Sequence, residues 1–195
     1  MLEQESGQVL VDRERSRRTL EQLLYYATHE PKLFSKLKLV WGDKDLFRLA
    51  WLQRNEKFYY NDRRVPGTLG VVNRFRQRYC GVTMVQYDLN GEEILFWHRN
   101  TIKLSGRGDD KHVWHVLQEL PIGDSELFPR IQSFNGEKIF NETSCFGVKR
   151  FEMNPHVRMR AVNKLGDDLA ALESVLIEYA RQAYELLQGE TSDLP

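Results

Sequence analysis

The pair Asn90-Gly91 lies between two strand-like runs of the sequence. The runs CGVTMVQYDL (80–89) and EEILFWH (92–98) contain many apolar and aromatic residues. Asn-Gly suits the centre of a type I′ turn, because both central residues of that turn need a positive φ, and such turns join neighbouring antiparallel strands. The sequence therefore predicts a β-hairpin over residues 80–98.

The rest of the chain alternates between strand-like and helical patterns. We expect strands at 7–12 and 111–120, and a smaller hairpin that joins 130–134 to 137–142 through a second Asn-Gly pair. We expect three helices. The first begins after Asp12, its N-cap, and ends at His29-Glu30-Pro31, and the second follows Gly42. The third runs from about 155 to 187 and is ended by Gly189. Residues 55–79 are predicted to be irregular. This order favours an α/β or α+β fold.

Length and charge restrict the possibilities further. The 195 residues suit one domain, predicted over 1–188 with a tail at 189–195. Lys plus Arg and Asp plus Glu both number 28, so nothing in the total charge favours nucleic acid or membrane surfaces as partners. The basic stretch at 61–79 is therefore interpreted as a solvated loop first and as an RNA contact only second. No apolar run approaches the roughly 20 residues of a membrane span and no signal peptide begins the chain, so a cytoplasmic location is the default.

The two cysteines, Cys80 and Cys145, are far apart in the sequence. A disulfide between them is possible, but two buried free thiols are the favoured interpretation for a reducing compartment.

Two short stretches carry residues suited to phosphate or metal chemistry. Asp43 and Asp45 form a D-x-D that can share a divalent cation, although two acidic residues at a helix start are more often a cap. His98 leaves a strand five residues before Lys103, so an imidazole and an ammonium group could hold a metal and a diphosphate together. Taken alone, a partly exposed histidine and a solvated lysine are the favoured interpretation.

The order of these stretches resembles the alpha-mannosyltransferases of glycosyltransferase family 71, best known as fungal Golgi enzymes. Three blocks of that family, E-S-G, G-D-K and H-x-N-x-x-K, have counterparts here over roughly residues 3–104. The similar stretches are, in the same order, ESGQVLVD, WGDKDLFRLAW and CGVTMVQYDLNGEEILFWHRNTIK. The resemblance implies the C-terminal part of a GT-A, Rossmann-like α/β fold, with the hairpin and a long C-terminal helix. It also implies transfer of a sugar from a nucleotide-diphosphate donor to a glycan acceptor, with GDP-mannose and Mn²⁺ favoured.

The resemblance further implies site residues. His98 would bind the metal, Lys103 would contact the diphosphate and Asn100 would orient their loop. Asp43 would be the catalytic residue beside the sugar. The remaining substrate-binding residues that it implies are Ser6, Gly7, Gly42, Lys44 and Gln86.

This sequence also departs from the family pattern. The D-x-D of the family lies upstream of E-S-G, whereas Asp43 and Asp45 match the G-D-K block. We therefore expect that the nucleotide-binding half is absent or comes from a partner chain, and that a fragment of a fungal family member would belong in the Golgi lumen. The alternative is a non-catalytic carbohydrate- or protein-binding remnant of the fold.

Overall fold

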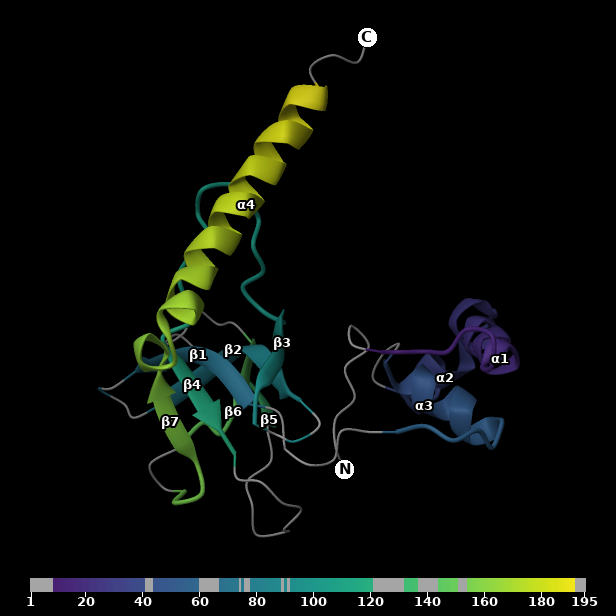
Figure 1. Cartoon of the computed structure of the whole chain (residues 1–195). Coiled ribbons are helices and arrows are strands. Elements are labelled where there is room, and N and C mark those ends of the chain that lie inside the picture. The colour runs from purple at the N-terminus through teal and green to yellow at the C-terminus, as the bar shows by residue number, and fades with distance from the viewer. Residues whose placement is uncertain are drawn as a thin grey trace. The chain divides into compact units, whose positions relative to one another are not determined.

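The computed structural model describes residues 9–40, 44–59, 67–73, 75, 78–88, 90, 92–120, 132–136, 144–150 and 154–191. The chain divides into two compact units, Met1–Asp62 and Arg63–Pro195 (Figure 1). The single domain expected over 1–188 stays a prediction.

Unit 1 contains the helices α1 (Arg17–Thr28), α2 (Leu33–Lys36) and α3 (Lys44–Gln53). Both helices predicted in this region are confirmed, and α3 buries Leu46, Ala50 and Trp51. The helix α1 begins later than expected, because the carboxylate of Asp12 accepts the N–H of Arg15 in a turn that precedes the helix. The predicted strand at 7–12 is wrong over its described residues, 9–12, which form no strand.

Unit 2 is built on one antiparallel sheet. Its strands are β1 (Gly67–Asn73), β2 (Arg78–Tyr87), β3 (Ile94–Arg99), β4 (Val116–Glu119), β5 (Gln132–Asn135), β6 (Ser144–Gly147) and β7 (Arg158–Ala161). The order is β5-β6-β2-β1-β4-β7, with β3 beside β2. Each pairing among the described strands is antiparallel. The mixed α/β class is confirmed, but a Rossmann-like sheet consists mainly of parallel strands, so this topology gives no support to the expected GT-A fold.

The β2–β3 hairpin is confirmed, with pairs running from Thr83↔Arg99 to Tyr87↔Ile94. Three neighbouring expectations were wrong in part. The strand β1 lies within the supposedly irregular 55–79, and β7 precedes the long helix inside its predicted range. The strand predicted at 111–120 is shortened to β4, because the N–H groups of Val113 and Trp114 bond to a helix carboxylate instead of a strand.

A second antiparallel pair joins β5, which ends at Asn135 of the second Asn-Gly pair, to β6. Its second strand is Ser144–Gly147, whereas the segment predicted for that role, 137–142, lies outside the described residues.

Cys80 of β2 and Cys145 of β6 form a disulfide, so the preference for free thiols was wrong. The two strands are neighbours through the pair Gly81↔Phe146, which brings together cysteines 65 residues apart in the chain. Both cysteines are fully buried in the core cluster of unit 2, beside Leu69, Val82 and Leu117.

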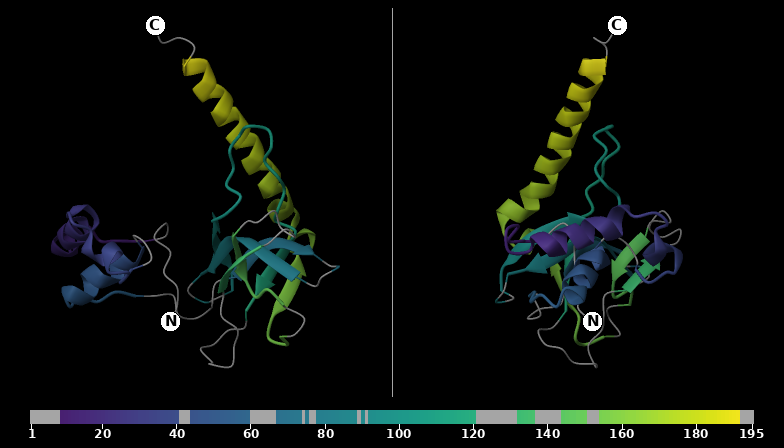
Figure 2. Two further views of the ribbon diagram at one scale, coloured as in Figure 1. Left: turned by 180° about the vertical axis from the view of Figure 1, so that it is seen from behind. Right: turned by 90° about the vertical axis from the view of Figure 1, so that its right-hand side faces the viewer.

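The long C-terminal helix is confirmed as α4 (Asp167–Thr191), which follows the short 3-10 helix η3 (Val162–Lys164). Its first turns pack Leu169, Leu172 and Leu176 on the sheet core, and the rest extends beyond the sheet (Figures 1 and 2). The helix continues past Gly189, since a glycine inside a helix costs only about 1 kcal/mol. Neither α4 nor any other described helix is apolar enough over a sufficient length to cross a membrane.

Candidate functional site

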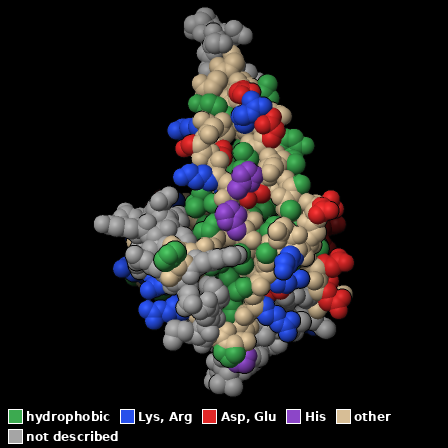
Figure 3. Space-filling model, turned by 90° about the vertical axis from the view of Figure 1, so that its left-hand side faces the viewer, with side chains coloured by type: hydrophobic (Ala, Val, Ile, Leu, Met, Phe, Trp, Pro, Cys, Tyr) green, Lys and Arg blue, Asp and Glu red, His purple; other side chains and the backbone are tan. Residues whose placement is uncertain are grey.

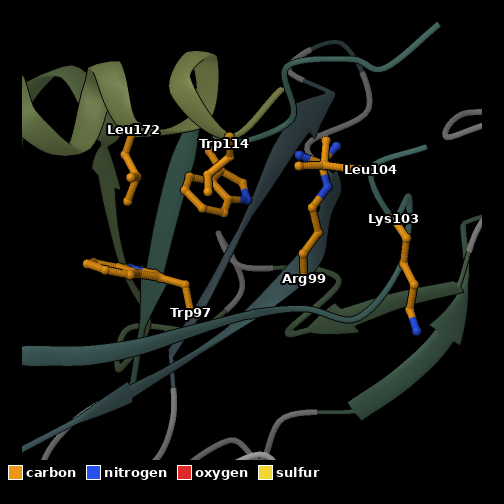
Figure 4. Close-up of a pocket in the computed structure, with 7 residues that line it drawn as sticks. Trp97, Arg99, Lys103, Leu104, Trp114 and Leu172 are labelled. Carbon is orange, nitrogen blue, oxygen red and sulfur yellow. The ribbon is translucent and has the colours of Figure 1, made fainter. Parts of the chain in front are cut away.

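A hollow of about 430 Å³ lies in unit 2, between β3, the loop after it, Trp114 and α4 (Figure 4). It is lined by Trp97, Arg99, Lys103, Leu104, Trp114, Leu172 and Leu176. Most of this surface is apolar, and the two basic residues come from β3 and from the loop that follows it. A concave apolar surface with few polar groups is the usual form of a small-ligand site.

Local periodicity explains which residues line the hollow. Side chains alternate between the two faces of a strand, so Trp97 and Arg99 of β3 share one face. Residues four apart lie on one side of a helix, so Leu172 and Leu176 both face the hollow from α4. In Figure 4 the ring of Trp97 lies opposite Leu172 and Trp114.

Each of the three nitrogen atoms of the Arg99 guanidinium group donates a hydrogen bond to the protein. The group donates from Nη1 to Glu173 Oε1 at 3.0 Å, from Nε to the carbonyl oxygen of Ile102 at 2.6 Å and from Nη2 to that of Lys111 at 3.0 Å. Burial lowers the pKa of Arg99, while the carboxylates of Glu173 and Asp110 act in the opposite direction. Arg99 therefore joins the strand, the loop and α4.

Glu173 is the carboxylate at the centre of this network. Although it is charged, only 3% of it is exposed. Its oxygens accept the N–H groups of Val113, at 2.9 Å, and Trp114, at 3.0 Å, and His112 Nδ1 lies 3.5 Å away. A buried carboxylate requires such partners, because the loss of hydration is otherwise very costly.

The loop between β3 and Val113 runs beside α4, as both views of Figure 2 show. Asp110 accepts the N–H groups of Ser105, at 2.8 Å, and Gly106, at 2.7 Å. Burial acts to raise the pKa of Asp110, but these hydrogen bonds and the charge of Arg99 lower it more, so the pKa lies below 3.8. Gly106 has φ +72°, and a Cβ there would lie 2.2 Å from the carbonyl oxygen of Ala180.

Several of the site residues predicted from the sequence fall together near the end of the hairpin. His98 pairs with Met84 and Gln86 with Phe96, and all four are neighbours on the two strands. Asn100 Nδ2 lies 3.4 Å from His98 Nδ1, and Asn100 Oδ1 accepts the N–H of Met84 at 3.0 Å. Asn100 thus fixes the chain that leaves β3.

Lys103 lines the hollow, but His98 does not. Strand alternation places His98 on the face of β3 opposite Trp97 and Arg99. Lys44 is the first residue of α3 in unit 1. The other predicted site residues, Ser6, Gly7, Gly42 and Asp43, lie outside the described residues. The roles given to all of these residues stay predictions.

A metal site needs several ligands around one point. Among the described residues, no group of three or more His, Cys, Asp or Glu side chains is placed to hold a metal ion. The described surroundings of His98, which include the side-chain amide of Asn100, therefore do not fit a Mn²⁺ site by themselves.

Sequence reasoning missed most of the residues that form the hollow. Trp97 and Arg99 are the two neighbours of His98 in β3. Because side chains alternate along a strand, the sequence could have shown that these two residues lie on the opposite face from His98. Leu172 and Leu176 lie within the helix predicted from about 155 to 187, and no ligand-binding role was predicted for them. No local signal marks Glu173, whose partners are 59 to 74 residues away in the sequence.

Comparison with known proteins adds a relationship for the N-terminal part of the chain. A family model described as "Mannosyltransferase putative" matches residues 1–88, from the start of unit 1 to the end of β2. The curated proteins and the solved structures give no match. The matched part of the chain is thus similar to a mannosyltransferase family.

Proposed function

We propose that this chain serves in glycosyl transfer, moving mannose from a nucleotide-diphosphate donor to a glycan acceptor. The observation that carries this proposal is the match of residues 1–88 to a mannosyltransferase family. The matched range includes Ser6, Gly7, Gly42, Asp43, Lys44 and Gln86, the residues proposed to bind substrate in this part of the chain. A GT71-type enzyme with GDP-mannose as donor is the specific form of the proposal.

The chemistry of such a transfer assigns a role to Lys103. Negative charge develops on the departing nucleoside diphosphate, and a cationic side chain stabilises it. Lys103 is exposed just after the hairpin, so its ammonium group can approach a phosphate. Asp43 is proposed to hydrogen-bond the sugar hydroxyls. Mn²⁺ would supply further positive charge, and in this proposal His98 is one of its ligands, with the others outside the described residues or on a partner chain.

The disulfide bears on the compartment. Disulfides persist in oxidising compartments and are rare in the cytosol. The Cys80–Cys145 bond therefore supports the lumenal alternative over the cytoplasmic default.

The direct test is calorimetric binding of GDP-mannose to the chain, with MnCl₂ and with EDTA. The proposal expects binding that requires Mn²⁺ and weakens at least tenfold, about 1.4 kcal/mol, in His98→Ala. His156→Ala is the matched control, because His156 is an exposed histidine in the turn before β7. Its affinity should equal that of the wild type.

Two outcomes would contradict the proposal, and a third would contradict only the assignment of His98. Absence of donor binding under both conditions would oppose nucleotide-sugar recognition by this chain. Binding of a mannose-rich glycan that ignores both metal and nucleotide would support the non-catalytic carbohydrate-binding alternative instead. Equal donor affinity in His98→Ala and the wild type would remove His98 from the metal site.

A further inference from the structure

We propose that the hollow beneath α4 is a binding site for a small amphipathic anion, with one apolar chain or ring and one carboxylate, sulfate or phosphate group. A volume of about 430 Å³ accommodates on the order of ten to fifteen non-hydrogen atoms, at about 30 Å³ for each small group. This inference does not rest on glycosyl transfer, since the family match ends before the first residue of the hollow.

The lining determines the apolar part of the ligand. Five of its residues are apolar or aromatic: Trp97, Leu104, Trp114, Leu172 and Leu176. Trp97 keeps 37% of its surface exposed even though it faces the hollow. Covering such surface removes apolar area from water, at about 25 cal/mol per Å². An apolar ligand is therefore favoured at this position.

The polar atoms of the lining argue against a sugar as the occupant. Arg99 already donates to Glu173, Ile102 and Lys111, and the indole N–H of Trp114 donates to Thr83 Oγ1 at 2.7 Å. A sugar carries a hydroxyl on most of its carbons, and each buried hydroxyl needs a partner. These committed groups leave few partners for several hydroxyls.

One cation at the edge of the hollow determines the charge of the ligand. Lys103 is exposed, and its ammonium group forms no ion pair with the part of the chain that the structure describes. In Figure 4 its side chain leaves the loop beside Arg99 and extends away from Trp114 and Leu172. A flexible lysine in this position pairs with one anionic group at the opening, while the apolar body lies among the rings.

The walls of the hollow are held apart, so that it does not collapse. Glu173 binds the N–H groups of Val113 and Trp114, and Gly106 packs against the carbonyl of Ala180. Ile102 is held at φ +51°, which is unfavourable for a β-branched residue, while Arg99 binds its carbonyl oxygen. Lys103 and Leu104 therefore sit on a fixed loop, and a preorganised site loses little freedom on binding.

The test uses decanoate, with decanol as the uncharged analogue of the same chain length. Both are titrated into the full chain by calorimetry and by tryptophan fluorescence, because two of the four tryptophans line the hollow. We expect Lys103→Gln to weaken decanoate about fivefold and to leave decanol unchanged, as for an exposed ion pair of about 1 kcal/mol. Lys111→Gln, which removes an exposed lysine of the same loop, should bind both probes like the wild type.

A second variant tests the hollow without altering charge. Leu104→Trp adds a ring from the loop side and should weaken both probes at least tenfold. Leu186→Trp places the same ring on the projecting part of α4, where Leu186 is 70% exposed, and should have no effect. A wild type that binds neither probe at millimolar concentration overturns the proposal. The proposal is also overturned if Leu104→Trp binds both probes like the wild type and has the same thermal unfolding transition. It is likewise overturned if Lys111→Gln, but not Lys103→Gln, loses decanoate affinity fivefold.

Discussion

The carboxylate of Glu173 lies 3.0 Å from the guanidinium of Arg99, although 74 residues separate them in the chain. Both side chains are nearly covered, with 4% and 10% of their surfaces exposed. Removing one partner of a buried ion pair leaves the other charge buried without compensation, and this costs more than the pair contributes. The contact therefore controls how α4 is attached to the sheet of unit 2.

Glu173→Gln should lower the free energy of unfolding of unit 2 by about 3 kcal/mol. The amide can still accept one N–H group, but it cannot neutralise Arg99. Urea denaturation followed by the fluorescence of Trp114 and Trp97 measures the change. Glu178→Gln is the control, because Glu178 is an exposed residue of the same helix that pairs with Arg181, and its effect should be close to zero. Equal losses in the two variants would contradict the role of burial.

Gly106→Ala should detach the loop from α4. The new Cβ would lie 2.2 Å from Ala180 O and 2.7 Å from Tyr184 Cβ, and a left-handed φ adds about 1 kcal/mol of strain. Gly108→Ala is the matched control, since Gly108 also has a positive φ, +87°, but a Cβ there would have no atom of the described residues within 4 Å. We expect Gly108→Ala to cost about 1 kcal/mol and Gly106→Ala at least 1 kcal/mol more. Thermal unfolding of the pair measures the difference, and equal midpoints would contradict the contact.

Local signals predicted the parts of the fold that local sequence determines. Asn90-Gly91 specified the β2–β3 hairpin, and the apolar spacing in α1, α3 and α4 specified helices, because each signal acts within a few residues. The strand β1 was missed although its sequence is GTLGVVN, since the arginines and Pro66-Gly67 around it indicated a loop. Its partners, β2 and β4, determine its structure.

The candidate site was predictable only in part, because tertiary contacts assemble it. Lys103 was identified from its own stretch, but Trp97 and Arg99 in that stretch were passed over in favour of the polar residues. Glu173 resembles any acidic residue of an amphipathic helix, and its burial follows from the packing of Leu172 and Leu176 on the sheet. The disulfide was equally hidden, since only the pairing of β2 with β6 brings the cysteines together.

Removing the disulfide should destabilise unit 2 by about 2–4 kcal/mol. The bond closes a loop between residues 65 apart, which restricts the unfolded chain, and both sulfur atoms lie in the core. The variant Cys80→Ala/Cys145→Ala is compared with the wild type by urea denaturation, with and without dithiothreitol. Dithiothreitol should lower the stability of the wild type and leave the double variant unchanged. A wild type whose cysteines react with iodoacetamide in the unfolded, unreduced state would contradict the disulfide.

Asp110 should make the stability of unit 2 depend on pH in acid. The N–H groups of Ser105 and Gly106 stabilise the charged carboxylate, so the pKa of Asp110 in the folded protein lies below 3.8. The contribution of Asp110 to the unfolding free energy is therefore present above pH 3.8 and decreases as the pH falls towards the folded pKa. The difference in unfolding free energy between the wild type and Asp110→Asn should therefore be largest at pH 6 and shrink below pH 3.8. Asp109→Asn changes the same charge at the exposed neighbour and should show a smaller difference. A difference for Asp110→Asn that grows on acidification would mean that the hydrogen-bonded loop favours the protonated carboxyl, contrary to its geometry.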